Sequence, residues 1–170
     1  MLEHISIERI RNLSHISAEL HPGATALFGA NGSGKTSVLE AIHLLGTGRS
    51  FRTHQSKPVI QHEQDDCRVV CRLRRQGRPL VMGIEKHRDG TARARVDGEN
   101  VASLSELARA MPIVLLDTDS LGLVTGPPEG RRKLLDGTLF HVEQTFLPLW
   151  RRYAQAMRQR NGGLRRGILD

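Results

Sequence analysis

A glycine-rich run that ends in lysine and threonine, at residues 29–36, constrains this chain more than any other feature. The run consists of Gly29, Ala30, Asn31, Gly32, Ser33, Gly34, Lys35 and Thr36, and it fits the phosphate-binding pattern G-x-x-x-x-G-K-[ST]. Residues 24–28 before it are mostly apolar, as in a buried strand. After it, apolar residues recur at helical spacing until Gly46, at Val38, Ala41, Ile42 and Leu45. The sequence therefore predicts a strand, a glycine loop and a helix over residues 24–45.

This arrangement suits the phosphates of a nucleotide. The three glycines of the loop allow a tight backbone turn whose N–H groups point at an anion, and the start of the helix adds a partial positive charge. We expect the ammonium of Lys35 to reach the β- and γ-phosphates and the hydroxyl of Thr36 to ligate Mg²⁺. A glycine-rich turn that binds nothing leaves this lysine and this threonine unexplained. The pattern therefore predicts nucleotide binding.

Alternating apolar residues predict antiparallel strands on both sides of the loop. Residues 5–20 have the pattern of a hairpin, with residues 24–28 as a third strand. A meander is expected at residues 67–75, 79–87 and 91–97, because X-Gly pairs separate these alternating runs. We expect this antiparallel sheet to lie beside the nucleotide-binding core.

A capping box and a proline bound the next helix. Ser103 and Glu106 have the S-x-x-E spacing that begins a helix, and Pro112 ends it. The apolar residues 113–116 then predict a buried strand, directly followed by Asp117. Nucleotide hydrolysis needs a strand-end Asp that holds Mg²⁺, and Asp117 is the candidate for that role. The alternative interpretation is that Asp117 caps the turn at residues 119–124.

The C-terminal part is predicted to be helical and basic. Glycines and prolines at residues 126–130 interrupt the chain, and residues 161–163 are expected to end the last helix. An apolar stripe there is interpreted as core packing; it consists of Phe146, Leu149, Trp150, Tyr153 and Met157. Of the net charge of +7, residues 131–170 carry +6, with 9 Lys and Arg against 3 Asp and Glu. This asymmetry fits either a polyanion-binding face or an ordinary charged helix exterior.

Composition narrows the class of protein further. No stretch approaches the roughly 20 apolar residues of a membrane span, and the first residues lack the pattern of a secretory signal, so we expect a cytoplasmic protein. Cys67 and Cys71 share one face of a predicted strand, at a separation of about 13 Å that is too long for a disulfide. We interpret them as small buried hydrophobic residues.

Several strings beyond the loop resemble the N-terminal part of the RecF family, bacterial recombination-repair ATPases related to SMC-type heads. They occur at residues 10–13, 28–42, 46–52, 96–98, 126–128, 131–132, 135–136, 140–143 and 159–161. The phosphate loop is common to many families, whereas its combination with Gly-Arg-Ser-Phe-Arg and Gln-Arg-Asn is more specific. This resemblance implies an α/β P-loop NTPase core, similar to ABC and SMC heads, with an antiparallel β-meander and the start of a helical lobe.

The same resemblance implies a domain division and a set of ligands. Residues 1–125 correspond to the ATP-binding lobe and residues 126–170 to the beginning of a basic helical lobe. The cofactors are ATP and Mg²⁺, and Arg11 and Asn12 match positions near the nucleotide base. The implied partners are RecR, RecO and the DNA backbone, with a homodimer that forms on ATP. The family's serine-glycine-glutamine signature is not found in these residues, so the chain is expected to be part of a longer protein and weak ATP hydrolysis is expected only in the intact dimer.

Two interpretations of other classes stay open on the sequence. A stand-alone small-molecule kinase would use Arg131 and Arg132 as a basic lid, although the hairpin before the loop fits such kinases poorly. A non-hydrolysing DNA-binding module would instead rely on the basic residues 131–170 and contact phosphates without reading bases.

Overall fold

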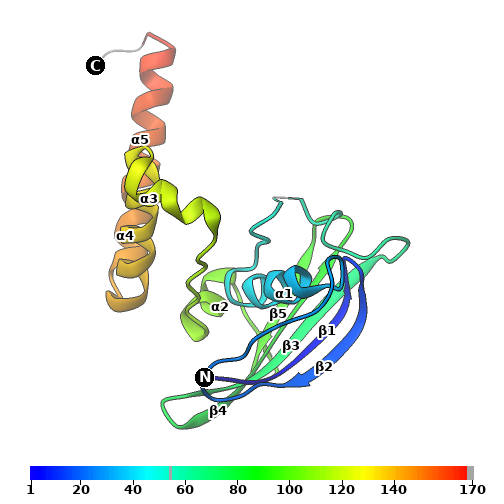
Figure 1. The fold of residues 1–170 in the computed structure, drawn as a ribbon. Helices are drawn as coiled ribbons and strands as arrows, with labels where there is room; N and C mark the ends of the chain where they lie inside the picture. Colours follow the sequence, from blue (N-terminus) through cyan, green and yellow to red (C-terminus); the bar gives the residue numbers. More distant parts are fainter. Residues whose placement is uncertain (54, 168–170) are drawn as a thin grey trace. The chain divides into compact units, whose positions relative to one another are not determined.

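The structure is a computed structural model that describes residues 1–53 and 55–167, drawn in Figure 1. The chain forms two compact units, the first spanning Met1–Leu115 and the second beginning at Leu116. The predicted division after residue 125 stays a prediction. The phosphate loop lies in the first unit.

The first unit is built on one antiparallel sheet with the strand order β2-β1-β3-β4-β5-β6. The strands are β1 (Leu2–Ile10), β2 (Leu13–Glu19), β3 (Asp66–Arg75), β4 (Arg78–His87), β5 (Ala92–Val96) and β6 (Glu99–Asn100). The predicted hairpin and the predicted meander are both confirmed. They form a single sheet because β1 pairs with β3 on one side and with β2 on the other.

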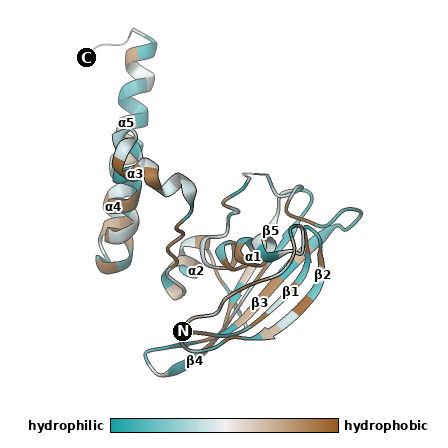
Figure 2. Ribbon diagram, viewed as in Figure 1, coloured by the Kyte–Doolittle hydropathy of each residue, from teal (hydrophilic) through white to brown (hydrophobic). Residues whose placement is uncertain are grey.

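Helices α1 (Lys35–Thr47) and α2 (Leu104–Ala110) contact each other, and their buried apolar residues share one core with the sheet. The alternation of hydrophobic and hydrophilic residues along the strands is visible in Figure 2. The inward-facing residues of the sheet include Ile5, Ile7, Cys67, Val69, Cys71, Met82 and Ile84. Both cysteines are buried and free, and burial raises the pKa of each thiol to about 11. Their interpretation as small hydrophobic residues is confirmed.

Helix α1 is confirmed, but its end and its buried face differ from the prediction. Gly46 lies inside the helix, which ends at Gly48 in the left-handed region (φ 71°), where the Gly48 N–H donates to the Leu44 carbonyl at 2.8 Å. The buried face is rotated from the predicted stripe and consists of Ser37, Glu40, Ala41, Leu44, Leu45 and Gly46. A carboxylate therefore lies on the face that packs into the core.

Two predicted strands are absent from the described part of the chain. Residues 24–28 form no strand and are exposed, and residues 113–116 likewise form no strand. The predicted buried strands at residues 24–28 and 113–116 are therefore wrong. The predicted unit over residues 24–45 has its loop and its helix but lacks its strand. An apolar run becomes a strand only when a neighbour accepts and donates its ladder hydrogen bonds, and no strand among residues 1–53 and 55–167 does so here.

The second unit is helical. Its elements are η1 (Thr118–Leu121), α3 (Gly122–Thr125), α4 (Pro128–Val142) and α5 (Phe146–Arg165). Helix α5 continues through Gly162 and Gly163, so the predicted end at residues 161–163 is wrong, since glycine lowers helix stability by about 1 kcal/mol without forbidding the helix. The stripe interpreted as core packing is largely exposed, with Leu149 and Tyr153 at 56% and 64%. In the described ranges, no helix has the length and apolar character needed to cross a membrane.

Candidate nucleotide-binding site

The three loop glycines have the backbone conformation that the sequence predicts for them. Gly29, Gly32 and Gly34 have φ values of 149°, 82° and 98°, in the region that side chains disfavour. The Ser33 N–H donates to the Ala30 carbonyl at 3.2 Å and closes a turn inside the loop. Gly34 also lies against the side chain of Leu13, so a methyl group at this position has no room.

The loop leads directly into α1, with Gly34 as its N-cap residue. The first intrahelical hydrogen bond runs from the Val38 N–H to the Gly34 carbonyl at 3.0 Å. The N–H groups of the preceding helical residues therefore have no acceptor within the helix. Together with the helix dipole they form an anion-binding end.

The side chain of Lys35 folds back over the loop. Its Nζ atom donates to the carbonyls of Gly29 and Ala30 at 2.9 and 2.8 Å. These contacts hold the ammonium at the loop, and phosphate oxygens can replace the two carbonyls as its acceptors. The Thr36 side chain is exposed at the start of α1, where its hydroxyl is accessible to a metal ion.

Arg11 and Asn12 reach the loop because they form the turn between β1 and β2, where Ile10 pairs with Leu13. Asn12 donates from Nδ2 to the Gly32 carbonyl at 2.8 Å and accepts from the Ser37 hydroxyl at 2.9 Å. Arg11 has a positive φ of 54°, and its N–H donates to the Val59 carbonyl at 2.9 Å. The hairpin turn therefore supports the loop from the side of the sheet.

A buried carboxylate lies behind this turn. Glu40 is 0% exposed and accepts two hydrogen bonds from Arg11, from Nε at 2.9 Å and from Nη2 at 2.7 Å. The hydroxyl of Ser50 also donates to Glu40, and Nη1 of Arg52 lies 3.4 Å from it. This bidentate pair with Arg11 is the geometry that guanidinium and carboxylate prefer.

Glu40 remains ionised at neutral pH despite its burial. Burial raises the pKa of a carboxyl, whereas the hydrogen bonds from Arg11 and Ser50 and the charges of Arg11 and Arg52 lower it. The net effect is a pKa of Glu40 below its ordinary value. The carboxylate therefore acts as a fixed negative anchor for both arginines.

These residues surround one cavity of about 500 Å³. Its lining consists of Arg11, Asn12, Asn31, Gly32, Gly34, Lys35, Thr36, Ser37 and Arg52. The structure thus brings together most of the predicted ligand residues; Gly29 and Ala30 contact Lys35, and Ser33 lies in the same loop.

Sequence reasoning missed four residues around this cavity, Ser37, Glu40, Ser50 and Arg52. A carboxylate at helical spacing from Leu44, on the apolar face of α1, was the available signal for Glu40.

Asp117 belongs to the second unit and has a local partner. Its Oδ1 atom accepts from the N–H and the hydroxyl of Ser120, at 3.0 and 2.9 Å, at the start of η1. This is the turn-capping geometry of the alternative interpretation, over Thr118–Leu121. A role of Asp117 toward magnesium stays a prediction, as do the ligand roles of the loop residues.

Comparison with known proteins identifies the family. The model of the RecF/RecN/SMC N terminal domain matches residues 1–123. The chain belongs to this family. The chain is 46% identical to the DNA replication and repair protein RecF of Azotobacter vinelandii, over 99% of this chain and 47% of that protein. RecF of Marinomonas sp. is 45% identical over 99% of this chain and 46% of its own length. The chain therefore spans about half the length of these RecF relatives, and the predicted resemblance to the RecF family is confirmed.

Solved structures agree on the fold. The RecF structure described as "RecF-ATPrS in RecFOR pathway" matches with a TM-score of 0.87 and 24% identity, over 98% of this chain and 45% of that chain. An SMC ATPase from work on ATP-driven dimerization matches with a TM-score of 0.66 and 21% identity, over 81% of this chain and 98% of that chain. The predicted fold class, a P-loop head with an antiparallel sheet, is confirmed.

Proposed function

We propose that this chain is the ATP-binding part of a DNA replication and recombinational repair protein of the RecF type. The observation that carries the proposal is the phosphate loop itself, in which three glycines have positive φ and the carbonyls of Gly29 and Ala30 hold the Lys35 ammonium over the loop. The hairpin turn at Arg11 and Asn12 and the anchor Glu40 support the same cavity. Membership of the RecF/RecN/SMC family supports ATP as the nucleotide.

In this proposal each residue has a defined task. The N–H groups at the start of α1 and Lys35 bind the phosphates, Thr36 holds Mg²⁺, and Arg11 and Asn12, which line the same cavity, are the residues expected near the nucleotide base. Magnesium would neutralise charge on the phosphates. Residues 29–36 thereby fix the orientation of the triphosphate.

The wider function is proposed by analogy with the RecF family. ATP would join two copies of the full-length protein as a clamp, with weak hydrolysis only in that dimer. The dimer would bind single-stranded, gapped or linear DNA through the backbone, act with RecR and RecO, load recombinase and support the SOS response in the cytoplasm. The charge of +6 at residues 131–170 supports backbone-directed DNA contact, because phosphate neutralisation needs no base reading.

The kinase alternative has less support. Arg131, one of the two arginines of the proposed lid, donates from Nη1 to the carbonyls of Leu123 and Gly126 at 3.1 and 3.0 Å. These bonds tie its guanidinium to the turn between α3 and α4, where it satisfies helix-end carbonyls. A lid arginine needs this group available for phosphate.

ATP binding at the loop predicts a stabilisation that depends on Lys35. At a hundredfold excess over Kd, ATP with Mg²⁺ is expected to stabilise the chain by about 2.7 kcal/mol. The Lys35→Ala variant should lose this stabilisation, measured as the rise in melting temperature on ATP addition. Lys57→Ala removes an exposed ammonium outside the cavity and serves as the matched control, with the ATP effect retained. An equal ATP effect in the wild type and in Lys35→Ala contradicts the proposal.

A further inference from the structure

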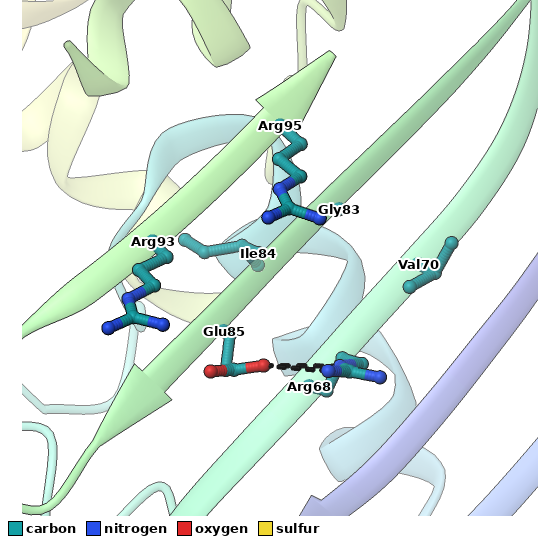
Figure 3. A pocket seen from close by; sticks show the side chains of 7 residues that line it. All are labelled: Arg68, Val70, Gly83, Ile84, Glu85, Arg93 and Arg95. Carbon is teal, nitrogen blue, oxygen red and sulfur yellow. Dashed lines mark hydrogen bonds and ion pairs between the residues drawn. The ribbon is translucent and has the colours of Figure 1, made fainter. Parts of the chain in front are cut away.

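A second hollow lies on the outer face of the sheet, on the side opposite the core. Its lining residues come from β3, β4 and β5, and its volume is about 410 Å³ (Figure 3). Cys67, Val69, Met82, Ile84 and Ala94 point inward and are buried. The alternate residues of the same strands therefore point outward, among them Arg68, Gly83, Glu85, Arg93 and Arg95.

Gly83 forms the floor of this hollow. It lies opposite Val70 on β3 and opposite Arg95 on β5. A Cβ atom added at Gly83 would lie 3.6 Å from the Val70 side chain, in ordinary contact. Larger side chains would therefore fill the space between Val70 and Arg95, and glycine keeps it open.

The hollow carries a positive charge because three arginines and one carboxylate line it, and the carboxylate is paired with only one of them. Glu85 lies directly opposite Arg93 in the sheet, yet it accepts hydrogen bonds from Arg68 on the other side, at 2.8 Å from Nη2 and 3.3 Å from Nε. The other oxygen of Glu85 lies 3.0 Å from Nε2 of His87. The hydrogen bond from Arg68 is the dashed line in Figure 3.

Two guanidinium groups remain without a carboxylate. Within residues 1–53 and 55–167, the guanidinium of Arg93 has no hydrogen bond or ion pair, and that of Arg95 donates only to the side-chain oxygen of Asn100 at 3.0 Å. Both extend from β5, Arg95 opposite Gly83 and Arg93 opposite Glu85 (Figure 3). Neighbouring arginines repel each other unless an anion lies between them, and guanidinium groups bind phosphate oxygens in pairs.

We propose that the hollow over Gly83 is a phosphate-group site, in which Arg93 and Arg95 hold the anion. It is distinct in sequence and in lining from the cavity of the phosphate loop. The phosphate group belongs either to the backbone of a nucleic acid or to a free phosphate compound. In the first case the inference rests on the proposed DNA contact and gives it a defined surface; the second case is independent of it.

The test compares three variants of the 170-residue chain. R93Q/R95Q removes both guanidinium groups that lack a carboxylate partner, and G83V fills the floor without changing charge. R75Q/R78Q removes two positive charges from the β3–β4 end of the same sheet and is the matched control. Binding of a fluorescein-labelled oligo(dT) is measured by anisotropy against salt, and binding of inorganic phosphate by thermal stabilisation in the Lys35→Ala background.

R93Q/R95Q is expected to weaken oligo(dT) binding about tenfold and to reduce the log–log salt slope by about 0.7, the amount for one phosphate of a single strand. G83V should weaken binding as well, while R75Q/R78Q stays close to the wild type. Loss in the oligo(dT) measurement assigns the phosphate to nucleic acid, and loss confined to inorganic phosphate assigns it to a free compound.

Three results would overturn the inference. They are equal losses in R93Q/R95Q and R75Q/R78Q, no loss in R93Q/R95Q with either probe, or a loss in R93Q/R95Q that G83V does not share. ATP stabilisation measured on the same proteins separates this failure from failure of the proposed function. It should persist in R93Q/R95Q, because neither arginine lines the loop cavity.

Discussion

Replacing Glu40 with alanine is expected to lower the free energy of unfolding by about 3–5 kcal/mol, the usual cost of removing one partner of a buried ion pair. The large effect arises because Glu40 is completely buried and neutralises Arg11, whose side chain is only 21% exposed. Without the carboxylate, Arg11 and Ser50 lose their acceptor inside the protein. The measurement is urea denaturation followed by circular dichroism.

Glu19→Ala is the matched control for this variant. Glu19 also accepts a hydrogen bond from an arginine, Arg72 at 3.1 Å, but its side chain is 69% exposed. Exposed pairs contribute about 0–1 kcal/mol, so the control should remain near the wild-type stability. Similar losses in the two variants would show that burial of Glu40 carries no special energetic weight.

The same carboxylate should make stability depend on pH. The pKa of Glu40 is lower in the folded protein than in the unfolded chain, so its contribution is complete above the unfolded value of about 4.3. It is lost as the pH falls below that value and through the lower folded pKa. The difference in unfolding free energy between the wild type and Glu40→Gln should therefore shrink from pH 6 toward pH 3. A difference that stays constant over this range contradicts an ionised Glu40.

The second large effect is expected for Gly34→Ala, which should abolish ATP stabilisation and destabilise the fold. A left-handed backbone costs a non-glycine residue about 1–2 kcal/mol, and Gly34 has a φ of 98°. The added methyl group also meets the side chain of Leu13, which is buried at 6% exposure and cannot move freely. Relief of this clash would displace the loop from the β1–β2 turn. Thermal shift with and without ATP measures both effects.

Gly98→Ala separates backbone strain from displacement of the loop. Gly98 has a φ of 84° and no heavy atom within 4 Å of an added Cβ, in a hairpin turn outside the nucleotide cavity. This variant should lose a similar backbone term but keep the ATP effect. If Gly34→Ala retains ATP stabilisation, contact with Leu13 does not set the position of the loop.

Local chemistry explains which parts of the fold could be predicted. The turns at Gln76-Gly77 and Asp97-Gly98 both have positive φ at their two residues, as expected for X-Gly pairs. The predicted strands that lead into and out of the first turn and into the second are confirmed, whereas β6 after the second turn was not predicted. The loop glycines were predicted for the same reason. In each case the residues that determine the conformation are adjacent in the sequence.

The errors concern features that depend on distant neighbours. Residues 24–28 and 113–116 have the composition of buried strands, but a strand also needs a partner, and composition does not specify one. The role of Glu40 was missed because its partners, Arg11 and Ser50, come from the hairpin turn and from the segment after α1. The helical periodicity of α1 places the carboxylate of Glu40 on the apolar face but does not reveal which residues contact it.

The exposed run before the loop has one further effect. Phe28 is 93% exposed and Leu27 41%, directly before Gly29. An exposed apolar segment outside any sheet can pair with a similar segment of another molecule, as an unprotected sheet edge does. At high protein concentration the chain should therefore self-associate through residues 24–28, and this association would block access to the phosphate loop.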